Sequence, residues 1–287
     1  MKKYISIYLI YFASSLFGAD LYTHFYMDNF HFNDNGVISS NDYDFIYGED
    51  VSQLITPGLY LDAGFNKTLI SDYSIYTDFR ITNDLFGFNL GIFTNFLNDS
   101  SKILTPGLNY GLNFTIPGII ILNLDLNNTI PNTSPLESGV SISNYDIKLG
   151  FYMGDAILSL NLISENNTKG NLLSSTSNAI NKYFFNIDLF NKYSKYRISI
   201  DLGWNYISRI MTTLSTDDSN NLSASLIDEK QAGSAYINTK FTILAIENIS
   251  IDAGLLLHLI KVPLKGVGSF ANDEFSWGFN LGLLLKL

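Results

Sequence analysis

Three histidines, His24, His31 and His258, are the side chains best suited to acid–base or metal chemistry in this chain. No HExxH pattern surrounds them, and the sequence has no cysteine, so it carries no standard zinc site and no thiolate nucleophile. A barrel-rim hydrolase would also need a serine and an amide or acid arranged around a histidine, and the sequence shows no matching pattern. We therefore interpret the histidines as structural polar side chains, with His258 inside the fold, and expect no enzyme activity and no cofactor.

A second candidate for chemistry is the group of acids formed by Asp217, Asp218, Asp228 and Glu229. Carboxylates are Ca²⁺ ligands, but these four lack the spacing of an EF-hand loop. A solvated acidic loop is the better interpretation, and we expect no metal site.

Charged residues are scarce, at 15% of the chain, where soluble domains average about 25%. The net charge of −10 argues against nucleic acid as a partner, because phosphates require Lys and Arg. Beyond residue 19 no run of about 18 apolar residues occurs, which excludes membrane-spanning helices. Low charge together with 14% aromatic residues favours a membrane protein built from strands.

The charges that remain follow an alternating pattern. Between residues 196 and 206, the apolar Ile198, Ile200 and Leu202 alternate with Arg197 and Asp201. Successive side chains of a strand point to opposite faces, so this segment presents one apolar and one polar face. The same pattern predicts further strands at 73–82, 86–96, 108–116, 145–153, 249–259 and 275–287, and less regular ones at 21–32, 43–54, 58–66, 119–127, 156–164, 182–190 and 234–244. The count is fourteen, with twelve as the alternative if 43–54 or another weak segment is a loop.

The last predicted strand separates two all-β folds. A soluble sandwich buries its apolar faces, whereas a transmembrane barrel turns them toward lipid, and periodicity alone does not distinguish them. The final strand has an apolar face that runs unbroken to the last residue: Phe275, Trp277, Phe279, Leu281, Leu283, Leu285 and Leu287. Tyrosines also lie near strand ends on apolar faces, as in an interfacial girdle: Tyr73, Tyr145, Tyr183, Tyr196 and Tyr206. We therefore predict an all-β transmembrane antiparallel up-and-down β-barrel.

The C-terminal strand resembles the signal read by the bacterial outer-membrane barrel-assembly machinery. That pattern has a polar residue, a Gly three positions before a hydrophobic residue, and a hydrophobic C-terminus, matched in order by Asn280, Gly282, Leu285 and Leu287. The chain departs from it by ending in Leu, where Phe is typical. The resemblance implies a porin-like barrel of the bacterial outer membrane, with outer-membrane lipid and the assembly machinery as partners.

The N-terminus predicts export. Lys2 and Lys3 precede an uncharged, mostly apolar stretch at 4–17, and the small residues Gly18 and Ala19 follow. This order is typical of a secretory signal peptide, and the stretch is short for a membrane anchor. We expect a signal peptide over 1–19 and a single barrel domain over 20–287.

The predicted connections differ in length on the two ends of the barrel. Short turns are expected at Thr56–Gly58, Thr82–Asp84, Pro117–Gly118, Gly154–Asp155 and Ala245–Asn248. Most of the others are longer: 33–42, 97–107, 128–144, 165–181, 207–233 and 260–274. Outer-membrane barrels have short periplasmic turns and long external loops, so we assign the long connections to the outside.

The polar faces of the predicted strands would line the interior. Their charged or ionisable members are Asp62, Asp78, Arg80, Asp125, Asp146, Lys148, Asp188, Arg197, Asp201, Lys240, Asp252 and His258. The small acidic excess predicts a modest cation preference, unless these groups pair across strands and only stabilise the wall. Fourteen strands lie between the filled eight-stranded barrel and the sixteen-stranded channel, which leaves a narrow pore unless a loop folds inward.

The sequence thus predicts an outer-membrane channel for passive diffusion of ions or small polar solutes. The alternative is a closed structural barrel whose external loops engage other molecules. The identity of a solute and the oligomeric state, homo-oligomer included, are left open.

Overall fold

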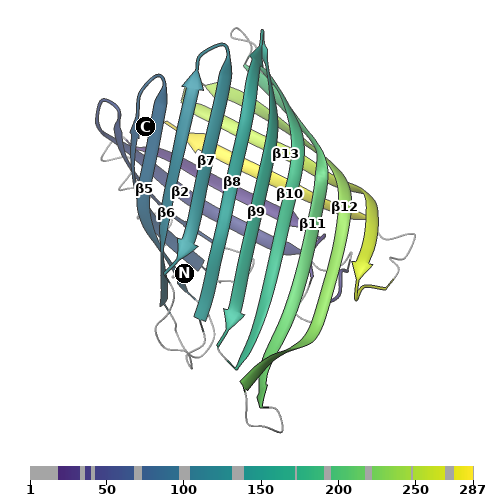
Figure 1. Ribbon diagram of the computed structural model, residues 1–287. Helices are drawn as coiled ribbons and strands as arrows, with labels where there is room; N and C mark the ends of the chain where they lie inside the picture. Colours follow the sequence, from purple (N-terminus) through teal and green to yellow (C-terminus); the bar gives the residue numbers. More distant parts are fainter. Residues whose placement is uncertain are drawn as a thin grey trace, which may run out of the picture.

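The chain forms a closed antiparallel barrel of fourteen strands in which each strand pairs with its neighbours in sequence and β1 pairs with β14 (Figure 1). The computed structural model describes residues 19–32, 36–39, 43–67, 73–96, 104–130, 139–171, 173–190, 195–216, 222–246, 248–268 and 275–286. The strands are β1 (Asp20–Asp28), β2 (Asp44–Thr56), β3 (Leu59–Asn66), β4 (Tyr73–Thr82), β5 (Phe86–Phe96), β6 (Leu104–Ile116), β7 (Ile120–Thr129), β8 (Gly139–Met153), β9 (Ala156–Gly170), β10 (Ser174–Phe190), β11 (Tyr196–Thr216), β12 (Leu222–Ile246), β13 (Ile249–Lys265) and β14 (Ser276–Leu285). The predicted fold class and the count of fourteen are confirmed.

The outer wall of the barrel is apolar, as the alternation predicts. On β5, Phe88, Leu90 and Ile92 are 43%, 49% and 65% exposed, although they are large apolar side chains. Asn89 and Phe93, which have the opposite parity on the same strand, line a cavity inside the barrel. Exposed apolar residues of this kind occur around the wall, from Phe79 on β4 to Leu255 on β13. This inside-out pattern is the one that a lipid-facing barrel requires.

Closure depends on the pairing of the first and last strands. In the β1–β14 ladder, Phe25 lies opposite Leu281 and His24 lies opposite Gly282. A Cβ at position 282 would stand 2.6 Å from the hydroxyl of Tyr22, so glycine permits this close approach. Because β14 also pairs with β13, the sheet has no free edge, which would leave backbone groups unpaired in lipid.

The predicted short turns are confirmed at one end of the barrel, which lies at the top of Figure 1. Gly58, Gly118 and Gly154 in these turns have φ values of 83°, 78° and 63°, in the region that glycine adopts without strain. The Asn83 side chain accepts hydrogen bonds from the backbone N–H groups of Leu85 and Phe86, which fixes the β4–β5 turn.

The prediction of a long loop is wrong at two places. The segment 165–181 is mostly strand, because β9 continues to Gly170 and β10 begins at Ser174. The segment 207–233 is also largely strand, since β11 is 21 residues long and β12 is 25. A transmembrane strand needs only about 9–11 residues, so these hairpins continue well beyond a bilayer. The predicted loops at 128–144, 97–107 and 260–274 are shortened in the same way, since β8 begins at Gly139, β6 at Leu104 and β13 ends at Lys265.

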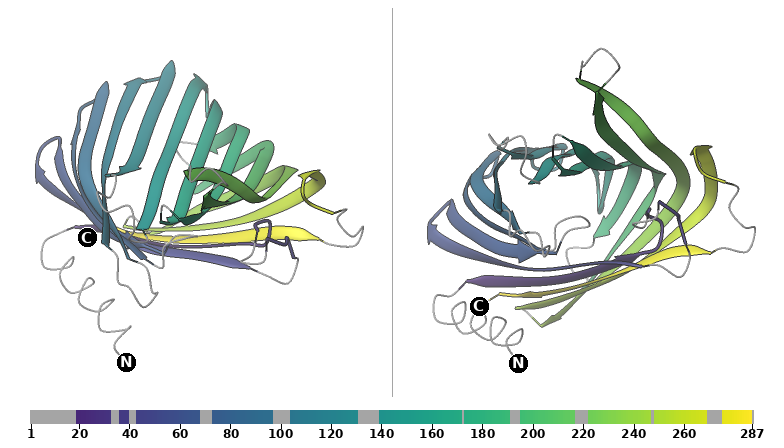
Figure 2. Two further views of the ribbon diagram at one scale, coloured as in Figure 1. Left: turned by 60° about the horizontal axis from the view of Figure 1, so that its bottom comes forward. Right: turned by 90° about the horizontal axis from the view of Figure 1, so that it is seen from below.

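Beyond the apolar wall the outward side chains of the β9–β10 hairpin are polar and hydrogen-bonded to each other. Ser164 Oγ donates to Asn181 Oδ1 at 2.7 Å, and Thr168 Oγ1 donates to Ser177 Oγ at 3.0 Å. A face of this kind suits water and not lipid. The β11–β12 hairpin projects furthest from the wall at the end opposite the short turns (Figures 1 and 2).

The connection between β1 and β2, expected as an external loop at 33–42, folds into the barrel at the residues that the structure describes. Phe30 is 1% exposed and packs with Ile38 against Ile207 and Ala232. Ile207 and Ala232 face each other across the β11–β12 ladder, next to Asn205 and Ser234 on the interior side of the wall. Burial of Phe30 therefore draws this connection inward, which period-2 alternation does not reveal.

Several sequence expectations fall outside the described residues. They are the signal peptide up to residue 18, the acids Asp217 and Asp218, and Leu287. Among the residues that are described, no helix is long and apolar enough to cross a membrane.

Candidate functional site in the barrel interior

The register of the ladders places every predicted interior residue on the inward parity of its strand. Asp62 lies opposite Asp78, and Asp125 lies opposite Asp146. Around the opposite side, Asp201 lies opposite Asn238, and Lys240 lies opposite Gly254. The remaining members, Arg80, Lys148, Asp188, Arg197, Asp252 and His258, occupy the same parity of their strands.

Three ion pairs join six of these residues. Arg80 donates to both carboxylate oxygens of Asp62, at 2.7 and 3.1 Å, in the two-pronged geometry that guanidinium groups favour. Arg197 makes a similar pair with Asp188, whose side chain is only 6% exposed. Lys240 Nζ lies 3.1 Å from Asp252. Cross-strand pairing thus neutralises much of the predicted interior charge.

Arg80 is held further by its neighbours. Its NH2 group also donates to Ser52 Oγ at 3.0 Å, and its guanidinium carbon lies 4.3 Å from the centre of the Tyr60 ring. These contacts fix the side chain against the wall of β2–β4, where a cation–π contact adds to the ion pair.

Four predicted acids form no ion pair within the described ranges. Asp78 accepts a hydrogen bond from Asn109 Nδ2 at 3.1 Å. Asp201 accepts from Asn186 and Asn238 at 2.6 and 2.8 Å. Asp125 and Asp146 face each other across β7–β8. The charge left uncompensated in the interior is therefore acidic, with Lys148 as a nearby cation.

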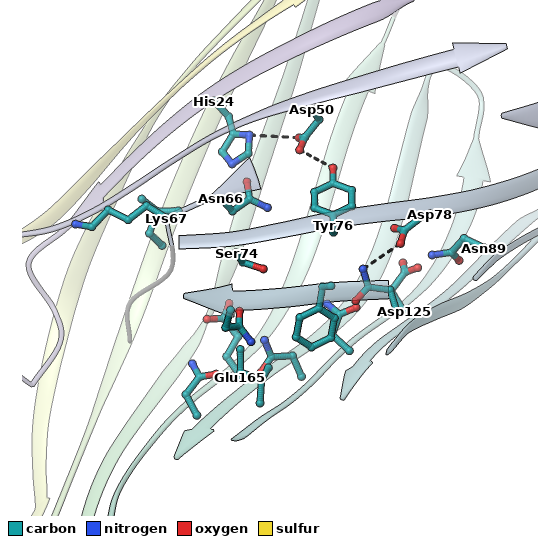
Figure 3. Close-up of a pocket in the computed structure, with 18 residues that line it drawn as sticks. His24, Asp50, Asn66, Lys67, Ser74, Tyr76, Asp78, Asn89, Asp125 and Glu165 are labelled. Carbon is teal, nitrogen blue, oxygen red and sulfur yellow. Dashed lines mark hydrogen bonds and ion pairs between the residues drawn. The ribbon is translucent and has the colours of Figure 1, made fainter. Parts of the chain in front are cut away.

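Polar cavities occupy the interior. One of them has a volume of about 470 Å³ and is lined by strands β1 to β9 (Figure 3). A second, of about 260 Å³, lies beside Asp125, Asp146, Lys148 and Asp188. A third, of about 120 Å³, lies beside Asp201 and His258. Ligand sites are typically cavities of about 300–1,000 Å³, so the first is large enough for a small solute.

Several further ionisable groups lie in the interior and were not predicted from the sequence. Asp50, on the weak strand β2, accepts a hydrogen bond from the Tyr76 hydroxyl at 2.5 Å and lies 3.5 Å from His24 Nδ1, as the dashed lines in Figure 3 show. Glu165 lines the same cavity from β9. Lys182 lies with its ammonium 5.4 Å from the centre of the Tyr26 ring. The alternation of inward and outward residues, followed through 43–54 and beyond residue 164, would have placed them on the inward face.

His258 stands between a serine and an aspartate, an arrangement that the sequence does not reveal. Its Nδ1 lies 3.0 Å from Ser234 Oγ, and its Nε2 lies 3.2 Å from Asp28 Oδ1. Ser234 is 0% exposed, and the ring of Phe30 covers His258 at a centroid distance of 4.5 Å. A buried serine without an approach for substrate does not form a working triad, so we interpret these contacts as an anchor for the β1–β2 connection.

Within the described part of the chain, no group of three or more His, Asp and Glu residues converges as metal ligands would. Asp188 lines the same cavity as Asp125 and Asp146, but it is held in an ion pair with Arg197. The acids Asp228 and Glu229 contact Lys230 and Lys265.

Comparison with known proteins places the fold but not the family. No protein-family model matches the chain, and no curated relative matches it. A solved bacterial polysaccharide outer membrane secretin has a TM-score of 0.51 at 9% identity, covering 94% of this chain and 98% of that one. An outer membrane channel from Pseudomonas putida F1 has a TM-score of 0.47 at 10% identity, with coverages of 93% and 95%. OmpT, an outer membrane protein of Vibrio cholerae, has a TM-score of 0.44 at 10% identity, with coverages of 93% and 96%. At these identities the similarity concerns the fold alone.

Proposed function

We propose that this chain is a channel of the bacterial outer membrane that lets ions or small polar solutes diffuse passively. The observation that carries the proposal is the combination of an apolar outer wall with polar interior cavities, one of them of about 470 Å³. A barrel that served only as a membrane anchor would have no need of such cavities. The resemblance of Asn280, Gly282 and Leu285 to the assembly signal supports delivery to the outer membrane, with the assembly machinery as a partner.

A modest preference for cations belongs to the same proposal. Asp62, Asp188 and Asp252 are paired with basic residues, so these three do not contribute to the net charge of the interior. Asp78, Asp125, Asp146 and Asp201 then dominate the remaining interior, together with Asp50 and Glu165. Carboxylates along a pore attract cations and repel anions. Their amide neighbours dilute the charge, so the preference is expected to be small.

The experiment is solute uptake by liposomes that contain the refolded full-length protein. Swelling in arabinose, glucose and sucrose measures passage of neutral solutes of increasing size, and empty liposomes serve as the control. The proposal expects swelling in the smallest solute that falls as solute size increases. Uptake no faster than in empty liposomes for every solute would contradict it.

A non-conducting barrel that acts through its exterior is the second candidate, because two observations favour it. Phe30 and Ile38 fill part of the interior beside β10–β12. The β11–β12 hairpin projects past the wall and exposes Leu226 and Ile227, which provides surface for contact with other molecules. This candidate expects no solute uptake by the liposomes, so the same experiment separates the two.

A further inference from the structure

The 470 Å³ cavity is lined by an unusual concentration of side-chain amides, and we refer to it as the amide cavity. Its asparagines come from six different strands: Asn66, Asn89, Asn95, Asn109, Asn127, Asn144 and Asn167. Asparagine is disfavoured in strands unless it has a specific role, so its gathering around one space is not explained by strand propensity.

Several of these amides are buried without a hydrogen-bond partner among the residues that the structure describes. Both side-chain polar atoms of Asn95 lack one, and the residue is 0% exposed. Asn109 is 8% exposed and Asn167 is 6% exposed, and the Oδ1 atom of each is also unpartnered. Buried polar groups are normally satisfied, because leaving them without a partner costs free energy. These atoms therefore point to a molecule that enters the cavity.

The free atoms define the chemistry of that molecule. Asn109 Nδ2 donates to Asp78, which fixes the amide so that its Oδ1 remains as an acceptor. Asn95 presents one free donor and one free acceptor side by side. A hydroxyl group both donates and accepts and so satisfies each kind of site. An ammonium group only donates, so it leaves the free Nδ2 donor of Asn95 without an acceptor. An anion only accepts, and Asp78, Asp125 and Glu165 in the cavity lining would repel it.

One side of the amide cavity is apolar. Phe93 and Ile142 line it and belong to a buried cluster with Val140, against which Tyr76 packs. Figure 3 shows Tyr76 close to Asp50 and Asp78. A saccharide has the matching character, because its ring carries C–H faces that pack on aromatic side chains and hydroxyl edges that bond to amides and carboxylates.

We propose that the amide cavity is a binding subsite for a neutral saccharide of one or two rings. The inference rests on the proposed diffusion function, since it names the solute class that the interior holds in passage. Asn95, Asn109 and Asn167 bond to its hydroxyls, and Phe93 packs against its ring.

The test is calorimetric titration of the refolded full-length protein in detergent with glucose, galactose, sucrose and lactose, and separately with spermidine and citrate. Saturable binding of at least one saccharide is expected, without saturable binding of the triamine or the tricarboxylate. Asn95→Ala should weaken saccharide binding about 5- to 10-fold, the effect of losing one or two hydrogen bonds. The side chain of Asn95 has no hydrogen-bond partner in the described part of the chain, so folding should persist, and heat-modifiable mobility on gels checks this.

Asn181→Ala is the matched control, because Asn181 faces outward and bonds to Ser164. Equal saccharide affinity in the Asn95→Ala and Asn181→Ala variants would overturn the subsite. So would binding of spermidine in preference to every saccharide, or no saturable binding by any of the four sugars. Failure of the diffusion function gives a different result, namely saccharide binding in detergent without uptake by liposomes.

Discussion

The Nε2 atom of His258 lies 3.2 Å from Oδ1 of Asp28, although the two residues are 230 positions apart in the chain. Asp28 ends β1, and it also accepts a hydrogen bond from the backbone N–H of Phe30 at 2.9 Å. The backbone N–H of Trp277 donates to Asn29 Oδ1 at 2.7 Å. Together these contacts turn the chain after β1 into the barrel, where Phe30 is buried.

Replacing His258 should therefore loosen the β1–β2 connection. In His258→Ala, the buried Asp28 carboxylate and the Ser234 hydroxyl each lose a partner, with an expected loss of about 1–3 kcal/mol in the free energy of unfolding. Limited proteolysis should then cut near Phe30 faster than in the wild type. Asp252→Asn, which removes the Lys240 ion pair on the same strand, is the control and should leave cleavage near Phe30 unchanged.

The two outward zones of the wall predict losses of different size for the same kind of substitution. Leu202 is 47% exposed on the apolar wall, so Leu202→Arg should cost about 2–4 kcal/mol if the residue lies near the bilayer midplane. Ser177, in the polar zone of β10, bonds to Thr168, and Ser177→Arg should cost about 1 kcal/mol or less. Urea unfolding in lipid vesicles measures both. Equal losses would show that the polar zone is also embedded in lipid.

The apolar wall could be predicted because the outward residues alternate regularly, as on β5 from Phe86 to Phe96. The extensions of β9 and β10 could not, since residues such as Ser164 and Ser177 are polar on the outward parity as well. Once a strand leaves the bilayer, both faces meet water and the hydrophobic period disappears. Its ladder is then specified by the neighbouring strand, which a single segment does not encode.

The interior shows the same division between local and non-local information. Parity assigned Asp62 and Arg80 to the inside, but their ion pair depends on the register of β3 against β4. Burial of Phe30 against Ile207 and Ala232 depends on the path of a connection between distant strands. The unpartnered state of Asn95 likewise arises from packing around the amide cavity, so the sequence placed it on a strand without indicating a site.

Charge selectivity should follow the acids that have no basic partner. Asp146→Asn removes one such charge beside the 260 Å³ cavity, so cation preference should fall slightly. The reversal potential across a bilayer in a KCl gradient measures this. Asp84→Asn, in the exposed β4–β5 turn, is a control of identical charge change and should leave the potential as in the wild type. A larger shift in the control than in Asp146→Asn would contradict the assignment of the interior charge.

The end of β14 should be required for assembly. Leu285 lies opposite both Leu21 and Ile249, so it belongs to the two ladders that close the barrel. Deleting residues 285–287 would leave backbone groups unpaired in lipid at several kcal/mol each. The truncated chain should therefore be degraded before insertion, as read from the loss of heat-modifiable protein in the membrane fraction. Leu226→Ala changes an exposed apolar residue that lies away from the two closing ladders, and this variant should insert normally.

Single-channel recording in planar bilayers tests the central claim most directly. Refolded full-length protein should produce discrete, ohmic current steps with a small cation preference, because a polar interior is enclosed by an apolar wall. His258→Ala should raise the step size by releasing the connection that carries Phe30. Correctly folded wild-type protein that inserts and gives no current steps would contradict the account and favour the closed barrel.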